Sequence, residues 1–160
     1  MPDTTEHLVN RLLIDRQKSS DYFNNLSPVD WERAIYTEGS CWTVHQVLAH
    51  FVAAEEGFHQ LIIDILNGGS GSPEDFDLDR YNERKVNDLT GIPISNLMQK
   101  FSDLRQGTVN LVAEMDSNDL EKQGRHPFLG MAPLSDIVKL IYRHNQIHIR
   151  EIRKTLTEET

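Results

Sequence analysis

Apolar residues recur along this chain at spacings of three, four and seven, the period of an amphipathic helix, whereas the alternation typical of strands is scarce. One such apolar stripe, expected to face the core, consists of Val44, Val47, Leu48, Phe51, Phe58, Ile62 and Ile65. Thr43 is a good N-cap in front of this stripe, and the glycine-rich residues 67–73 cannot continue the helix. The pattern predicts an all-α protein.

Three further segments with helical periodicity are residues 5–26, 92–115 and 133–156. Residues 30–39, 75–88 and 116–131 read as connectors without a strand pattern, and the middle one carries a short helical pattern. Four helices of roughly 20 residues joined in this way predict a four-helix bundle. The length of 160 residues suits a single domain spanning residues 1–160.

The chain carries 25 acidic and 16 basic side chains, a formal net charge of −9 with neutral histidines. This charge argues against nucleic acid and against anionic membranes, because both are bound by clustered lysine and arginine. No run of about 18 apolar residues is present, and the N-terminal residues lack the features of a secretory signal, so we expect a cytoplasmic protein. The single cysteine, Cys41, excludes an internal disulfide and a multi-cysteine metal site.

Two of the seven histidines share a face of the last helix. On a wheel at about 100° per residue, His144 and His148 fall among the apolar residues of that helix, which are Leu134, Ile137, Val138, Ile141, Ile152 and Leu156. A lone histidine there is usually a core residue with one hydrogen bond. A pair four residues apart can bind one metal ion, and a stranded donor or acceptor would otherwise cost about 1–3 kcal/mol.

A third histidine, His50, lies at the edge of the stripe in the second helix, where it can face into the bundle. Three histidines without an evident fourth protein ligand are typical of a reactive metal centre, because catalytic sites keep a coordination position open. Glu55 falls in the same stripe, and it either accepts a hydrogen bond beside the metal, acts as a base, or forms a salt bridge to a neighbouring helix. His126 either rims the same pocket or is an ordinary loop histidine.

The remaining histidines, His7, His45 and His59, are expected at the surface or packed against connectors. Cys41 is not expected to be a nucleophile, since nothing near it in the sequence would activate its thiol.

Residues 42–51, WTVHQVLAHF, and residues 144–148, HNQIH, resemble the motifs of the DinB-like superfamily, also called the YfiT-like metal-dependent hydrolases. Residues 126–131 look like that family's run-in to its final helix. The resemblance covers nearly the whole chain in length and helix order. It implies an up-down-down-up bundle, commonly a homodimer, that holds a divalent metal ion, zinc or nickel, at His50, His144 and His148.

The resemblance also suggests a reaction, because the superfamily includes transferases and isomerases that use low-molecular-weight thiols such as bacillithiol or mycothiol. The first hypothesis is therefore a thiol S-transferase acting on a small molecule, and the second is a hydrolase with metal-activated water. A non-catalytic metal-binding or bacterial stress-response bundle is the alternative from another class. A plain helical dimerisation protein without metal is a further one.

Substrate contacts are expected from the connectors at the metal end of the bundle. The candidates are Arg80, Tyr81 and Asn82 in the second connector and Arg125 and His126 in the third. Ordinary loop packing and helix capping remain the alternative for each. The two arginines would matter for an anionic substrate, which the net charge would otherwise repel.

Overall fold

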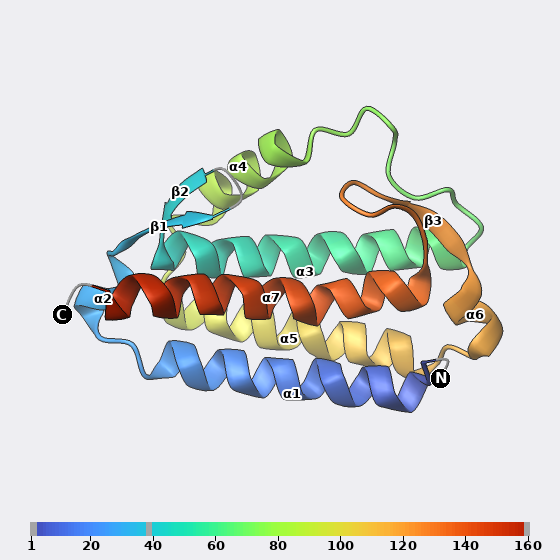
Figure 1. Ribbon diagram of the computed structural model, residues 1–160, viewed down its shortest axis with the longest axis horizontal. Helices are drawn as coiled ribbons and strands as arrows, with labels where there is room; N and C mark the ends of the chain where they lie inside the picture. Colours follow the sequence, from blue (N-terminus) through green and yellow to red (C-terminus); the bar gives the residue numbers. More distant parts are fainter. Residues whose placement is uncertain (1–2, 38–39, 159–160) are drawn as a thin grey trace.

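A computed structural model describes residues 3–37 and 40–158, and within them four long helices form a bundle (Figure 1). They are α1 (Thr5–Asn24), α3 (Val44–Leu66), α5 (Ile94–Ala113) and α7 (Leu134–Thr157). Helices α1 and α7 run in one direction and α3 and α5 in the other, so the up-down-down-up arrangement is confirmed. The Gly39 end of the first predicted connector and the first and last two residues of the predicted domain lie outside the described residues.

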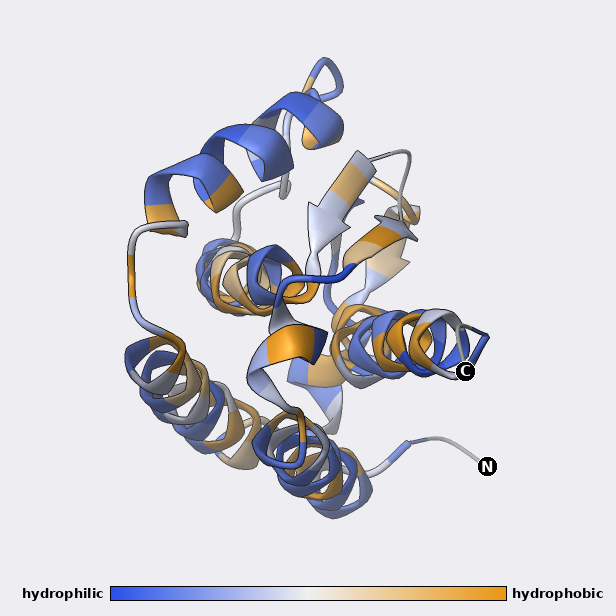
Figure 2. Ribbon diagram, turned by 90° about the vertical axis from the view of Figure 1, so that its left-hand side faces the viewer, coloured by the Kyte–Doolittle hydropathy of each residue, from blue (hydrophilic) through white to orange (hydrophobic). Residues whose placement is uncertain are grey.

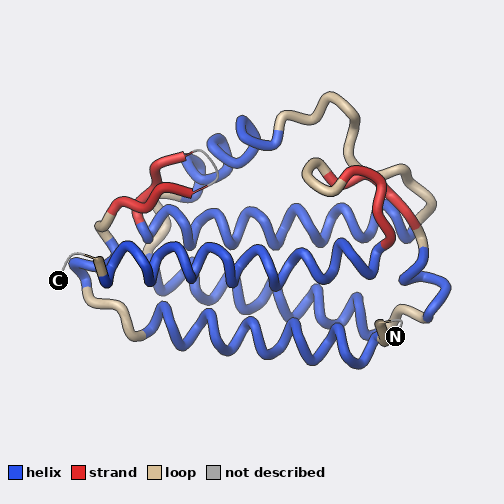
Figure 3. Tube along the Cα trace, viewed as in Figure 1, coloured by secondary structure: helices blue, strands red, loops and turns tan. Residues whose placement is uncertain are grey.

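The shorter elements are α2 (Pro28–Trp31), β1 (Ala34–Thr37), β2 (Ser40–Thr43), α4 (Leu78–Leu89), α6 (Ser117–Glu121), β3 (Gln123–His126) and β4 (Gly130–Pro133). Strands β1 and β2 pair antiparallel, as do β3 and β4 (Figure 3). The expectation of connectors without strands was therefore wrong. Each of these strands has four residues and pairs within one hairpin, which is too short for alternation to stand out from the sequence.

The start of α3 is determined by a capping box, and Thr43 is its N-cap as expected. The Thr43 hydroxyl accepts a hydrogen bond from Gln46 N at 3.1 Å, and Gln46 Oε1 accepts one from Thr43 N at 2.9 Å. Because Thr43 is also the last residue of β2, the hairpin leads directly into the helix. This junction sets the phase of α3 and therefore the direction in which His50 points.

The long connector between α3 and α5, residues 67–93, crosses the outside of the bundle, as its length suggested. Its helix α4 packs along α3 (Figure 1). An end-on view shows α4 outside the four long helices with a mostly hydrophilic surface (Figure 2). The connector is joined to β3, because Ser72 N donates to Arg125 O and Arg125 N donates to Ser70 O, both at 2.8 Å. Gly71 has a φ of +89°, and a Cβ there would lie 2.4 Å from Arg125 N, so this position requires glycine.

The interior contains two apolar clusters with polar residues between them. One cluster includes Leu8, Leu12, Ile62, Val112, Leu134 and Ile137, and the other includes Phe23, Trp42, Phe51, Phe101, Ile149 and Ile152. The buried polar residues that lie between them along the helices include Asp15, Ser19, Glu55, Arg105, Asn145 and His148. Among the described helices, none has both the length and the apolar character needed to cross a membrane.

Arg105 is the centre of this polar layer and is completely buried. Its Nε and one terminal nitrogen donate to the two carboxylate oxygens of Glu55 at 3.0 and 2.8 Å, and the other terminal nitrogen donates to Asp15 Oδ2 and Leu12 O, each at 2.9 Å. Asn145 Nδ2 also donates to Asp15, at 3.1 Å. Burial alone would lower the pKa of Arg105, but Glu55 and Asp15 outweigh it and the pKa is raised.

Arg105→Leu is expected to destabilise the protein by about 3–5 kcal/mol, because it leaves two buried carboxylates without their cation. The measurement is urea unfolding, with Arg150→Leu as the control because Arg150 is exposed on α7. The control should change stability by no more than about 0.5 kcal/mol. Equal unfolding midpoints for the two variants would contradict a structural role for the buried arginine.

Candidate metal centre

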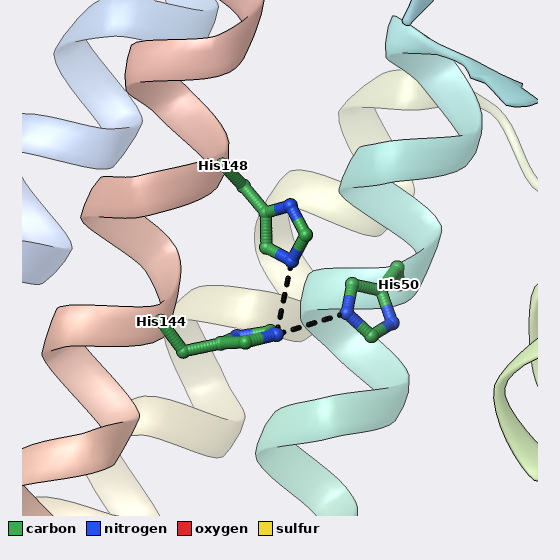
Figure 4. Close-up of side chains that lie close together, drawn as sticks. All are labelled: His50, His144 and His148. Atoms are coloured by element: carbon green, nitrogen blue, oxygen red, sulfur yellow. Dashed lines mark hydrogen bonds between the residues drawn. The ribbon is translucent and has the colours of Figure 1, made fainter. Parts of the chain in front are cut away.

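Three histidines converge at the centre of the bundle, one from α3 and two from consecutive turns of α7 (Figure 4). The Nε2 atom of His144 lies 3.1 Å from that of His50 and 3.0 Å from that of His148. His50 and His148 are almost fully buried, and His144 is half-buried. The structure thus brings together the three residues that helical periodicity selected.

The donor set fits a metal ion. His148 Nδ1 lies 3.2 Å from Glu151 Oε1, so this nitrogen carries the proton and the Nε2 lone pair of His148 faces the other two rings. A single N–H on His144 Nε2 can point at only one of its two neighbours, which leaves the other close contact without a hydrogen bond. Three nitrogens about 2.1 Å from zinc would lie about 3.0–3.4 Å apart, and the two distances from His144 Nε2, 3.1 and 3.0 Å, fall in this range.

Aromatic side chains surround the triad and hold its rings. The Trp42 ring centroid lies 4.9 Å from that of His50, Phe51 lies 6.0 Å from His148, and Phe58 lies 6.4 Å from His144. Trp42 and Phe51 are buried, so this side of the triad is shielded from water. Apolar surroundings of this kind strengthen the interaction between a cation and its ligands.

His126 lies on β3 beside the triad and is only 8% exposed. Its ring stacks on Phe58, and its Nδ1 accepts hydrogen bonds from Phe128 N at 2.9 Å and Leu129 N at 3.2 Å. These two donors leave Nδ1 without a proton, so the neutral ring carries its proton on Nε2. Burial, assisted by the neighbouring His144, lowers the pKa of His126 to about 4.

A cavity of about 850 Å³ opens beside the triad, between α3, α4, α7 and the β3–β4 hairpin. Its walls include all three histidines of the triad together with Tyr81, Asn82 and His126, which were predicted to contact the substrate. His126 therefore rims the same pocket and is not an ordinary loop histidine.

The two arginines predicted to contact the substrate lie elsewhere. Arg80 is exposed and is not part of the cavity wall, and the Arg125 guanidinium pairs with Glu74 at 3.2 Å. Their role in substrate binding stays a prediction that the cavity does not support. Glu55, for which three interpretations were open, forms the salt bridge to the neighbouring helix.

His7 is exposed and His45 Nε2 lies 3.0 Å from Ile92 O, as expected. His59 is half-buried on α3 and faces Gly107 of α5, so it packs against a neighbouring helix and the expectation of a surface or connector position was wrong.

Sequence reasoning missed Glu151 and Arg105. Glu151 stands three residues after His148, one helical turn away, and this spacing could have revealed it. Arg105 stands four residues from both Phe101 and Val109, inside the apolar stripe of its helix, where a lone arginine indicates a buried acidic partner.

Comparison with known proteins identifies the class of fold. Residues 11–152 match the DinB superfamily, and the chain belongs to that family. YfiT from Bacillus subtilis, described as a probable metal-dependent hydrolase with an unusual four-helix bundle topology, is similar with a TM-score of 0.76 and 17% identity over 94% of this chain and 84% of YfiT. No curated protein matches the sequence.

Two other solved structures share the fold. A mycothiol-dependent maleylpyruvate isomerase has a TM-score of 0.75 and 12% identity, and the match covers 95% of this chain but only 61% of the isomerase. The colibactin self-resistance protein ClbS, solved with double-stranded DNA, has a TM-score of 0.69 and 13% identity over 96% of this chain and 98% of ClbS. Identities this low establish the common fold alone.

Protein purified without a histidine tag is expected to contain about one divalent metal ion per chain, and His148→Ala should lose it, because only two of the three nitrogens then remain. Elemental analysis by mass spectrometry measures this. His45→Ala, on the same helix as His50, is the matched control and should keep its metal. Metal content that survives in His148→Ala would place the ion elsewhere.

The His126 ring is expected to stay neutral down to about pH 4, with its proton on Nε2, because its folded-state pKa is lowered. Two-dimensional ¹H–¹⁵N NMR of the zinc-loaded protein distinguishes the protonated nitrogen and follows the titration. His126→Asn identifies the signal by its absence. A titration midpoint at the ordinary value of 6.5 would contradict the buried, doubly bonded arrangement.

Proposed function

We propose that this protein is a metal-dependent enzyme that transfers a low-molecular-weight thiol to or from a small molecule. The observation that carries the proposal is the position of the triad, whose Nε2 atoms converge on the wall of a cavity large enough for a small-molecule ligand. Among residues 3–37 and 40–158, no cysteine, carboxylate or further histidine joins the three-histidine group as a fourth ligand. An ion held there would keep open coordination positions, as catalytic sites require.

The chain prepares this site in three ways. Glu151 holds the proton of His148 on Nδ1 and thereby keeps Nε2 available to the ion. Trp42 and Phe51 exclude water from the bundle side, and neutral His126 offers an Nε2–H donor at the rim. Zinc and nickel both suit imidazole ligands, and either would supply a Lewis acid that lowers the pKa of a coordinated thiol or water.

The two likenesses point to different reactions: that to a mycothiol-dependent isomerase supports thiol transfer, and that to YfiT supports hydrolysis. Thiol transfer would need a separate thiol, because Cys41 is exposed on β2 and is not part of the cavity wall. The net charge of −9 counts against the double-stranded DNA that ClbS binds. The homodimer and the cytoplasmic location stay predictions.

The test offers monochlorobimane, or a similar electrophile, to the metal-loaded protein with bacillithiol, mycothiol, glutathione and coenzyme A in turn. At least one thiol should give a protein-dependent rate that falls to background in His148→Ala and is kept in His45→Ala. If no thiol gives such a rate but ester hydrolysis is lost in His148→Ala, the enzyme is a hydrolase. The absence of both activities would favour a non-catalytic metal-binding bundle.

A further inference from the structure

Asn82 is a buried amide on the wall of the cavity. It lies on α4, is 7% exposed and lines the cavity. Within the described part of the chain, no residue forms a hydrogen bond with its side chain. Buried amides nearly always have hydrogen-bond partners, so a nearly buried amide on a cavity wall without a partner in the chain is suited to a ligand.

A second buried polar group faces the same cavity from the hairpin. His126 uses Nδ1 to accept from Phe128 N and Leu129 N, which leaves an Nε2–H donor. No acceptor for this N–H is found among residues 3–37 and 40–158. The cavity therefore offers one group that only donates, at His126, and one that both donates and accepts, at Asn82.

The remainder of the wall is aromatic and acidic. Apolar surface comes from the rings of Phe58, Phe76, Tyr81 and Phe128. Four carboxylates, those of Glu56, Asp64, Asp79 and Glu151, face a single ammonium group, that of Lys85. Even a divalent cation at the triad would leave the wall with more negative than positive charge, so anionic groups are disfavoured in the part of the cavity away from the ion.

We propose that the cavity binds an uncharged carbonyl compound with an aromatic body, such as an aromatic amide or ester, through hydrogen bonds from His126 and Asn82. This inference rests on the proposed function, because the bound carbonyl compound would be the small-molecule substrate of the thiol reaction.

The His126 donor, the excess of acidic groups and the aromatic rings of the wall together favour an uncharged aromatic carbonyl compound. A carbonyl oxygen accepts from the His126 donor, whereas a simple cation has no acceptor and would leave that donor unpaired. A carboxylate could accept the same bond, but it meets the excess of negative charge. The aromatic side chains provide apolar surface for the body of the ligand.

The first experiment measures the dissociation constant of benzamide for the full-length, zinc-loaded protein by ligand-observed NMR. Asn82→Leu should raise this constant about fivefold, because the amide hydrogen bonds are lost. Asn87→Leu is the matched control, since Asn87 is exposed on the same helix, and it should leave binding unchanged. Equal benzamide binding in wild type and Asn82→Leu, or no benzamide binding to the wild type, would overturn the proposal.

The second experiment compares benzoate with benzamide, which has the same size and shape without the charge. The ratio of the dissociation constant of benzoate to that of benzamide should fall at least about threefold from wild type to the double variant Glu56→Gln/Asp79→Asn. Asp88→Asn, an exposed position on α4 away from the cavity wall, should not change the ratio. Any binding of benzoate to zinc is common to all variants and cancels in this comparison.

An unchanged ratio in the double variant would overturn the electrostatic part of the proposal, and with it the exclusion of anions. Because Glu56 and Asp79 are exposed, this comparison remains decisive if Asn82→Leu fails to fold. Neither measurement uses a thiol or turnover. Failure of the thiol screen with normal benzamide selectivity would therefore reject the proposed reaction while leaving the ligand class standing, and the reverse result would do the opposite.

Discussion

The buried charge of Arg105 is the constraint on which the arrangement of the helices depends. A guanidinium without access to water has to be paired on all sides, and its partners come from α3 through Glu55 and from α1 through Asp15 and Leu12 O. Asp15 in turn accepts from Asn145 on α7. One charge therefore links all four helices of the bundle. Rotating any of these helices by one residue, about 100°, would move its partner away and leave a buried charge unpaired.

The same network determines the direction of the three histidines. Asn145 stands between His144 and His148 in the sequence, so the rotation of α7 that places Asn145 against Asp15 also sets the direction of both histidines. On α3, Glu55 faces α5 while His50, five residues earlier, faces α7. The triad and the ion network thus lie on different sides of the same two helices. The two apolar clusters beside this polar layer shield it from water along the bundle, and the cavity gives access to the triad.

Local signals account for what could be predicted from the sequence. The four helices, the cap at Thr43 and the positions of His50, His144 and His148 on inward-facing helix stripes all follow from spacings within single helices. Partners that are far apart in the sequence could not be predicted in the same way. Arg105 and Asp15 are separated by 90 residues, and their pairing depends on which helices are neighbours. The wall of the cavity depends likewise on the contact of the 67–77 connector with β3, which is made by backbone groups that carry no sequence signal.

The site has two parts, one built from the long helices and one from the elements that connect them. The long helices carry the triad, Glu151 and the Arg105 network, and Trp42 packs on the triad from β2. A change in the buried Arg105 network disturbs the packing of the bundle. Asn82, Tyr81 and His126 come from α4 and the β3–β4 hairpin, which lie outside the bundle and contact it along one side. Substitutions in these outer elements can alter the ligand that the cavity accepts without moving the three nitrogens. Under the proposed function, the connectors would control specificity and the bundle would control metal binding.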